Sequence, residues 1–271
     1  MTGLRPVALI TGASSGIGAA FARIFAEKGH HPVLVARREA ALNAVADEIA
    51  ASGRSRPLVI PIDLTRIDTP VRIGHELGAR GLEPAFVVNN AGYGLLGRAT
   101  ELDRTEQLAM IDLNVRALTD LSLRFIDNLA RHRGGILNVA SVAGFFPGPG
   151  MALYHATKAY VLSFSESLHQ ELAPLGIRVS VLCPGPVPTG FHARAGINDA
   201  MLPRLLTCSA DAVAREGYEG LMRGKRVVIP GRTNRLMRLM LHAAPRQALL
   251  SIFDAAMKSR RATRPPWPKR T

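Results

Sequence analysis

Apolar residues along the chain occur in short continuous runs separated by longer amphipathic stretches. The apolar runs are rich in β-branched residues and cover residues 6–11, 31–36, 57–62, 85–90, 135–141, 177–183 and 225–230. Helical periodicity marks the stretches between them, at 16–29, 38–52, 69–80, 103–132, 151–173 and 209–223. Strands that read as unbroken apolar runs are buried on both faces, as in a parallel sheet covered by helices. The pattern predicts an α/β fold with one doubly wound parallel sheet of about seven strands and helices on both faces.

The sequence predicts one domain, residues 1–231, followed by a basic extension, residues 232–271, and charge is distributed unevenly along the chain. Residues 223–271 hold 13 of the 34 Lys and Arg but one of the 21 acidic residues, so their net charge is 13 − 1 = +12. Residues 1–222 carry the other 21 basic and 20 acidic residues, a net charge of +1. The strong basicity therefore belongs to the C-terminal part of the chain.

The extension has an amphipathic pattern. Residues 232–243 place four apolar residues on one helical face, namely Leu236, Leu239, Met240 and Ala243. The basic face carries Arg232, Arg235 and Arg238. A second amphipathic segment covers 246–258 after Pro245, and about the last ten residues have a composition typical of disorder. Such a helix can dock on its own domain or on a neighbouring subunit, lie on an anionic membrane surface or, least favoured, bind nucleic acid.

Targeting signals and cysteine chemistry add little. The first ten residues run directly into an apolar segment without a basic region, and no apolar run approaches roughly 18 residues. We therefore expect a cytoplasmic protein, with peripheral membrane contact as an open alternative. The two cysteines, Cys183 and Cys208, have neither metal-ligand spacing nor the density of a disulfide framework, so we expect no metal.

A glycine-rich turn, "TGASSGIG", follows the first predicted strand and leads into a helix. Glycines at 12, 16 and 18 permit a tight turn and close approach of backbone N–H groups to a diphosphate, which the helix N-terminus favours. Their spacing differs from the commoner G-x-G-x-x-G, so the turn matches that fingerprint in logic only. The predicted cofactor contacts here are Gly12, Ser14, Ser15, Gly16, Ile17 and Gly18.

Three later strand ends extend this dinucleotide site. Arg37 and Arg38 end the second strand, where an acidic residue would favour NAD, so NADP is favoured unless these arginines are only solvated helix starts. Asp63 and Leu64 end the third strand; the carboxylate could bind adenine or cap the turn. The fourth strand ends in small and amide residues that would let a ring or ribose pass closely, unless they form a simple turn: Asn90, Ala91 and Gly92.

A tyrosine and a lysine lie four residues apart in the helical stretch "LYHATKAYVLSF". That spacing places the side chains of Tyr154 and Lys158 on one helical face. Free tyrosine titrates near pH 10, so it exchanges protons slowly at neutral pH unless a positive charge favours the phenolate. A lysine one turn away supplies such a charge.

These motifs together resemble the short-chain dehydrogenase/reductase family over residues 5 to about 190. The combination of TGASSGIG, NNAG, a serine after the fifth strand and Tyr-x-x-x-Lys is specific, although each motif alone is weak. The resemblance implies that Ser141 binds the substrate oxygen, and that Tyr154 is the general acid or base. It further implies that Lys158 binds the nicotinamide ribose and lowers the tyrosine pKa. By the same resemblance, Asn114 holds a water linking Lys158 to solvent.

The resemblance also assigns the segment "PGPVPTGF" at 184–191 to a turn over the nicotinamide. The implied cofactor contacts in this turn are Pro184, Gly185, Val187 and Thr189. The loop that follows, to about residue 207, is the expected substrate lid.

The expected substrate rim is largely apolar and comprises Tyr93, Leu95, Leu96, Phe145, Phe146, Met151 and Phe191. It favours a hydrophobic ketone, aldehyde or secondary alcohol. The sequence thus predicts an NADP-dependent oxidoreductase, NAD being less favoured, in a homodimer or homotetramer. The alternative is a catalytically silent NADP-binding regulator or a protein associated with a membrane surface.

Overall fold

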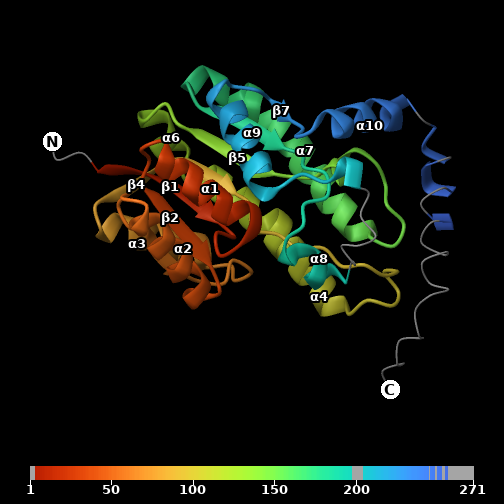
Figure 1. The fold of residues 1–271 in the computed structure, drawn as a ribbon, viewed down its shortest axis with the longest axis horizontal. Helices are drawn as coiled ribbons and strands as arrows, with labels where there is room; N and C mark the ends of the chain where they lie inside the picture. Colours follow the sequence, from red (N-terminus) through yellow and green to blue (C-terminus); the bar gives the residue numbers. More distant parts are fainter. Residues whose placement is uncertain (1–3, 197–203, 244, 248, 252–253, 256–271) are drawn as a thin grey trace.

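The structure is a computed structural model, and it describes residues 4–196, 204–243, 245–247, 249–251 and 254–255 (Figure 1). Its centre is a sheet of seven strands in the order β3-β2-β1-β4-β5-β6-β7, in which every neighbouring pair is parallel. The strands are β1 (Arg5–Thr11), β2 (Pro32–Ala36), β3 (Leu58–Pro61), β4 (Leu82–Asn89), β5 (Gly135–Val139), β6 (Arg178–Leu182) and β7 (Val227–Val228). The predicted fold class is confirmed.

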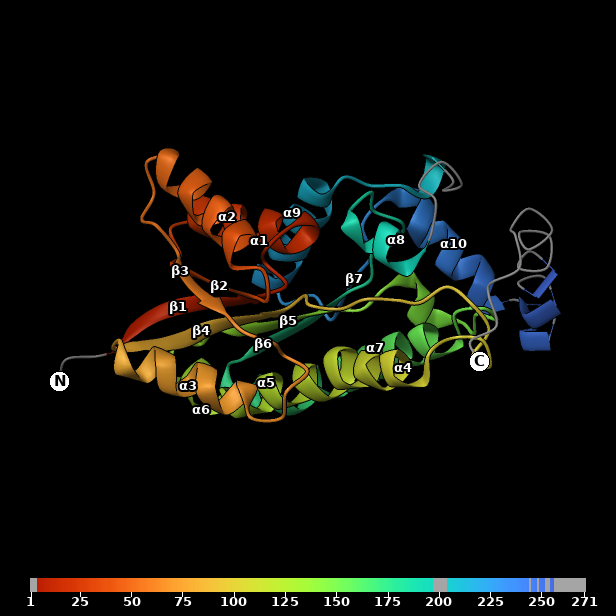
Figure 2. The same ribbon diagram turned by 90° about the horizontal axis from the view of Figure 1, so that it is seen from below.

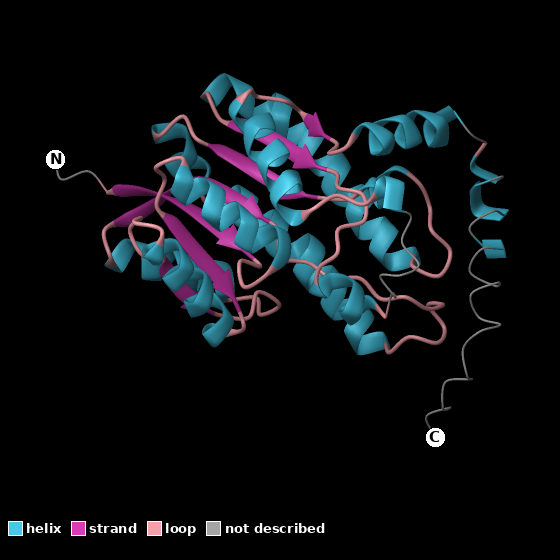
Figure 3. Cartoon of the chain, in the orientation of Figure 1, coloured by secondary structure: helices cyan, strands magenta, loops and turns pink. Residues whose placement is uncertain are grey.

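Helices cover both faces of the sheet, as Figures 2 and 3 show. One layer consists of α1 (Gly16–Glu27), α2 (Glu39–Ala51) and α9 (Ala210–Met222). The other layer consists of α3 (Thr69–Ala79), α4 (Arg104–Ile111), α5 (Leu118–Arg124), α6 (Ile126–Arg131) and α7 (Ala152–Leu172). In β1, Ala8 and Ile10 pack toward the first layer, whereas Val7 and Leu9 pack toward the second. Burial on both faces explains the continuous apolar runs of the sequence.

The strand order reverses beside β1, which lies between β2 and β4. In sheets of this type, ligands bind at the carboxyl ends of the strands where the order reverses. Thr11, the last residue of β1, joins β1 to the end of β4. Its hydroxyl donates to the Val88 carbonyl (3.2 Å) and accepts from the backbone N–H groups of Asn90 and Ala91 (3.0 Å each). The topology therefore brings the glycine turn and the NNAG segment together.

Two predicted elements differ from the structure. The single helix expected at 103–132 is divided into α4, a π-helical segment Asp112–Ala117, α5 and α6. The strand expected at 225–230 is only Val227–Val228, and Pro230 has no N–H to extend the pairing. π-Helical turns widen a helix locally and occur often at functional sites, and this one carries Asn114.

Glu83 forms a buried charge cluster near the amino end of β4, away from the carboxyl edge. Its carboxylate accepts from Arg131 (2.6 Å), Asn128 (2.8 Å) and His132 (2.8 Å), and its side chain is 7% exposed. Burial raises the pKa of Glu83, but the hydrogen bonds from Arg131, Asn128 and His132 outweigh it and lower the pKa to about 2, against an ordinary value of 4.5. This cluster stabilises the ionised form of the carboxylate.

Replacing Glu83 by glutamine is expected to lower the free energy of unfolding by roughly 2 kcal/mol at neutral pH. Because the folded pKa lies below the unfolded one, the stabilisation is complete above pH 4.5 and is lost as pH falls toward 2. Urea unfolding across this range should therefore show a flatter pH dependence for Glu83→Gln. Glu76→Gln, which removes an exposed carboxylate paired with Arg80, is the control. Equal pH dependence in wild type and Glu83→Gln would contradict this account.

The basic extension begins with α10 (Arg232–Ala243), which docks on the domain that precedes it. The Arg235 guanidinium pairs with Glu216 (2.7 Å), and that of Arg238 lies 5.0 Å from the Phe145 ring centre. Of the alternatives left open by the sequence, docking on its own domain is observed for α10. The predicted apolar face stays exposed at Leu236, Leu239 and Met240.

Much of what was expected for the rest of the extension lies outside the described residues. This holds for parts of the second amphipathic segment and for the predicted disorder at the end of the chain, as well as for residues 197–203 of the predicted lid. Within the described part, no helix combines the length and hydropathy needed to cross a bilayer.

Candidate active site

The glycine turn packs its backbone directly against the end of β4. Gly12 has φ +66°, and a Cβ atom added there would lie 2.8 Å from Asn90 Nδ2. A Cβ on Gly18 would lie 2.3 Å from the Gly12 carbonyl oxygen. Asn90 Nδ2 donates to the Thr11 carbonyl (2.9 Å) and so fixes the turn to the NNAG segment. The turn leaves no room for side chains at these glycines, and α1 begins within it. In this arrangement a bound diphosphate would lie at the N-terminus of the helix.

Arg38 reaches from the end of β2 to this turn. Its Nη2 donates to Ser14 Oγ (3.2 Å) and to Ser15 Oγ (3.0 Å). Arg37 lies near Asp63, since its charge contributes to lowering the pKa of that carboxyl group. Arg38 therefore brings a positive charge to the glycine turn, where the sequence predicts that the 2′-phosphate of NADP binds.

Asp63 caps the turn after β3. Its Oδ1 accepts from the backbone N–H (3.0 Å) and the hydroxyl (2.8 Å) of Thr65. Although burial raises its pKa, these bonds and the nearby arginines lower it overall. The capping role left open by the sequence is thus observed for one carboxylate oxygen. Leu64 is buried, 4% exposed, and packs in the core.

Close contacts link the glycine turn, the NNAG segment and the 184–191 segment. A Cβ on Gly92 would lie 3.0 Å from Asn114 Oδ1 and 3.5 Å from Lys158 Nζ, so the glycine permits both side chains to approach. A Cβ on Gly16 would lie 2.9 Å from Thr189 Cγ2. Residues predicted from four separate motifs therefore meet at one edge of the sheet.

Ser141, Tyr154 and Lys158 also lie at this edge. Ser141 follows β5, and its Oγ accepts from the Ala143 N–H (3.1 Å) and donates to the Pro184 carbonyl (3.4 Å). Lys158 is buried on α7, donates to the Val139 carbonyl (2.8 Å) and has its Nζ 5.8 Å from the Tyr154 ring centre. The three side chains predicted to act together are brought together.

Burial controls the protonation of this group. It raises the pKa of Tyr154 to about 12, an effect opposed by a hydrogen bond between the side chains of Tyr154 and Ser141. Burial also lowers the pKa of Lys158 to about 8. Burial therefore holds the tyrosine in its protonated form, and the expected lowering of its pKa by Lys158 stays a prediction for the site with its cofactor bound.

Asn114 is held rigidly in the π-helical segment. Its Oδ1 accepts from the Tyr93 N–H (3.1 Å), while its Nδ2 donates to the Tyr93 carbonyl (2.9 Å) and to Thr157 Oγ1 (3.1 Å). The widened turn thus directs this amide to the segment after NNAG and to α7. These bonds define the orientation of the side chain, and both Asn114 Oδ1 and Lys158 Nζ lie close to Gly92. The water expected to link Asn114 with Lys158 stays a prediction.

The expected apolar rim forms only in part. Leu95, Met151 and Phe191 pack in the same cluster as Tyr154, and the rings of Phe191 and Tyr154 are 5.5 Å apart. Leu96 donates its N–H to the Ala195 carbonyl of α8 (Gly190–Ala195) at 3.0 Å.

Tyr93 belongs to the same buried cluster as Tyr154, whereas Phe145 and Phe146, also expected on this rim, lie in other surroundings. Tyr93 is 4% exposed and donates to the Glu106 carbonyl (2.7 Å). Phe145 packs on a separate cluster near α10. The Phe146 ring makes an edge-to-face contact with the His155 ring (5.2 Å between centres), and His155 Nδ1 lies 2.8 Å from the Phe146 carbonyl oxygen.

Sequence reasoning missed several residues that shape the site. The Arg194 guanidinium lies 4.0 Å from the centre of the Tyr93 ring, which joins α8 to the segment after NNAG. Thr11 ties β1 to β4, and Asn234 from α10 contacts the 184–191 segment. The threonine of the TG pair was a usable signal, whereas contacts made by α8 and α10 depend on how distant segments fold.

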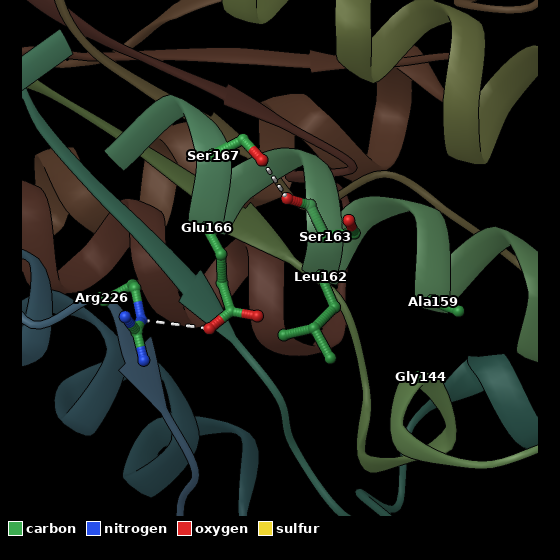
Figure 4. Close-up of a pocket in the computed structure, with 7 residues that line it drawn as sticks. All are labelled: Gly144, Ala159, Leu162, Ser163, Glu166, Ser167 and Arg226. Carbon is green, nitrogen blue, oxygen red and sulfur yellow. Dashed lines mark hydrogen bonds and ion pairs between the residues drawn. The ribbon is translucent and has the colours of Figure 1, made fainter. Parts of the chain in front are cut away.

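A surface groove on α7, shown in Figure 4, is distinct from this site. It is lined by Gly144, Ala159, Leu162, Ser163, Glu166, Ser167 and Arg226. Arg226 pairs there with Glu166 at 3.0 Å. Because the groove contains none of Ser141, Tyr154 and Lys158, we do not assign the chemistry to it. Among the described residues, no cluster of three His, Cys, Asp or Glu side chains could hold a metal ion.

The fold and the assembled site define the class of dinucleotide-binding oxidoreductases. A sequence model of the short chain dehydrogenase family matches residues 6–199. The chain therefore belongs to the short-chain dehydrogenase/reductase family.

Several known proteins are similar to this chain. Sulfoacetaldehyde reductase 2 of Chromohalobacter salexigens is 34% identical over 189 residues, which cover 68% of this chain and 74% of that protein. A short-chain dehydrogenase from Sphingobium yanoikuyae, solved in complex with NADPH, is 32% identical with a TM-score of 0.76 and covers 98% and 99% of the two chains. The bulky-bulky ketone specific alcohol dehydrogenase from Comamonas testosteroni is 30% identical with a TM-score of 0.72 and covers 98% of each chain.

Proposed function

We propose that this protein is an NADP-dependent oxidoreductase that interconverts a carbonyl and a secondary alcohol on a hydrophobic substrate. The observation that carries the proposal is the meeting of Ser141, Tyr154 and Lys158 beside the glycine turn. NADP would be held by the turn at 12–18, by Asn90, Ala91 and Gly92, and by the segment containing Pro184, Gly185, Val187 and Thr189. When bound, the cofactor supplies or accepts the hydride.

The protein's own groups supply the proton and the polarisation. Tyr154, with a pKa raised to about 12, is protonated at neutral pH and can donate to a carbonyl oxygen. Ser141, hydrogen-bonded to Tyr154, can donate to the same oxygen and stabilise the developing negative charge. Lys158, with a pKa of about 8, is largely charged at neutral pH and offers positive charge to the phenolate that forms. Asn114 would fix the backbone on one side of this group.

Arg38 is the proposed determinant of NADP preference. Arg38→Ala is expected to weaken NADPH binding roughly tenfold to a hundredfold, since a charge-assisted contact to phosphate contributes about 1.5–3 kcal/mol. NADH binding should change little. Arg56→Ala removes a surface arginine paired with Asp47 and serves as the control. The measurement is the dissociation constant of each cofactor. An equal loss of affinity for NADH and NADPH would show that Arg38 does not recognise the 2′-phosphate.

The substrate class rests on the apolar neighbours of Tyr154. Leu95, Met151 and Phe191 pack around that ring, and one similar protein is described as specific for bulky ketones. A panel of aliphatic, aromatic and bulky ketones and aldehydes, together with ketones and aldehydes that carry a carboxylate or sulfonate, tests the proposal through the loss of NADPH absorbance. The proposal requires turnover of hydrophobic members above that of charged ones.

A catalytically silent NADP-binding regulator is the alternative, and the presence of serine, tyrosine and lysine together favours the enzyme. A homodimeric or homotetrameric assembly, a cytoplasmic location and contact of the extension with an anionic membrane stay predictions from the sequence.

A further inference from the structure

We propose that Asn234, in the C-terminal extension, is a positioning residue for the cofactor segment at 184–189. The extension would then be a working part of the active site. The inference rests on the proposed function for its catalytic consequence, but the contact itself is a property of the protein alone.

Asn234 is completely buried, although it lies on a helix whose apolar residues are largely exposed. Its Nδ2 donates to the carbonyls of Pro230 (2.9 Å) and Leu206 (3.1 Å) and lies 3.8 Å from Cys208 Sγ. Because both strong partners are carbonyl oxygens, the nitrogen end of the amide must face them. This fixes the oxygen end on the opposite side.

The whole amide group of Asn234 lies against Gly185, because Oδ1, Cγ and Nδ2 are all within 2.7 Å of the position of an added Cβ. A Cβ atom added at Gly185 would lie 2.5 Å from Asn234 Oδ1, so the amide occupies the space of a side chain at that position. Within the described part of the chain, this buried oxygen has no hydrogen-bond partner. A buried polar atom left unpaired opposes folding, so an apolar residue would suit simple packing better. The amide at this place therefore indicates a role in holding neighbouring segments.

Short contacts lead from Asn234 to the catalytic serine. The Pro184 carbonyl, next to Gly185, accepts from the Val142 N–H (3.0 Å) and from Ser141 Oγ (3.4 Å). The Pro186 carbonyl accepts from the Cys208 N–H (3.1 Å), beside the Asn234 amide. A shift of Gly185 would thus move the carbonyl that contacts Ser141.

Hydrogen bonds on either side of Asn234 hold the first turn of α10 in place, so that Asn234 can position the 184–189 segment. Thr233 Oγ1 donates to the Leu205 carbonyl (2.6 Å), and Arg235 Nε donates to the Ile229 carbonyl (2.8 Å). Asn234, between them, joins the residues after β7 to those that precede α9. One amide therefore connects three segments of the chain at the back of the cofactor segment.

Asn234→Leu, which keeps the size and removes the amide, tests the proposal in the full-length protein. Leu239→Gln changes an exposed residue on the same helix and is the matched control. We expect amide hydrogen exchange at Val142 and Cys208, whose N–H groups donate to the Pro184 and Pro186 carbonyls, to become at least tenfold faster in Asn234→Leu without cofactor. The NADPH dissociation constant should rise about tenfold. The control should match the wild-type protein in both. Unchanged exchange and unchanged NADPH affinity in folded Asn234→Leu would overturn the proposal.

A second pair of variants keeps the test decisive if Asn234→Leu does not fold. Gly185→Ala should accelerate exchange at the Val142 and Cys208 amides, and adding Asn234→Ala should bring that exchange closer to wild type by removing the clash. If the two substitutions changed the exchange rates independently and additively, the proposed contact between Asn234 and Gly185 would be wrong. If wild type fails to bind NADPH, the proposed function fails, while the exchange measurements still decide the role of Asn234.

Discussion

Tyr154→Phe is expected to lower turnover by roughly 10²–10⁴-fold, the usual contribution of a general acid or base. The substitution removes the hydroxyl and keeps the ring that packs against Phe191, so the fold and NADPH affinity should change little. The hydroxyl matters because its proton is the one available beside the Ser141 side chain. Steady-state rates and NADPH titration separate the two effects.

Tyr160→Phe is the matched control for this prediction. Tyr160 lies on the same helix and is 39% exposed, and its hydroxyl lies 3.0 Å from the Thr119 hydroxyl, outside the site. It should retain turnover within about twofold of wild type. Substantial turnover in Tyr154→Phe would show that this hydroxyl does not transfer the proton.

Gly18→Ala is expected to weaken NADPH binding by at least roughly a hundredfold, a loss of about 3 kcal/mol. The new methyl group would lie 2.3 Å from the Gly12 carbonyl oxygen and 2.5 Å from Asn90 Nδ2. Because the first of these is backbone, the turn itself must open and lose the shape that admits a diphosphate. Calorimetric titration with NADPH measures the loss.

Gly78→Ala is the control for the glycine turn. Gly78 lies in α3 with no atom of a neighbouring segment within 4 Å of an added Cβ, and alanine favours a helix. This variant should bind NADPH as tightly as the wild-type protein and unfold at the same or a slightly higher temperature. Tight NADPH binding by folded Gly18→Ala would place the diphosphate elsewhere.

The sheet was predictable because its strands are buried on both faces. In β1, no side chain is more than 3% exposed at four successive positions, Val7, Ala8, Leu9 and Ile10. Such a continuous apolar run can be recognised in the sequence without knowledge of the fold. The juxtaposition of motifs followed from topology, since parallel strands place their carboxyl ends at one edge. The glycine turn and NNAG segment meet there as expected.

Features that depend on tertiary packing were not predictable. The π-helical segment at Asn114 has a sequence compatible with an ordinary helix, and its widening accompanies bonds to Tyr93 and Thr157. The pKa of Tyr154 depends mainly on how deeply the folded chain buries its hydroxyl, which the local sequence does not determine.

The orientation of α10 also depends on distant partners. Its polar face docks through Asn234 and Arg235, which find carbonyl oxygens and Glu216, whereas Leu236 and Leu239 remain exposed. Hydrophobic periodicity identifies the apolar face of a helix, but it does not determine which face packs against the rest of the protein.

In the proposed reaction, the protein transfers a hydride from NADPH to a hydrophobic carbonyl while Tyr154 supplies the proton. The most direct test uses NADPH deuterated at the transferring position with the ketone panel, and mass spectrometry of the alcohol product. The account predicts one deuterium on the carbinol carbon with the wild-type protein and almost none with Tyr154→Phe. Tight NADPH binding with no labelled alcohol from any member of the panel would contradict it.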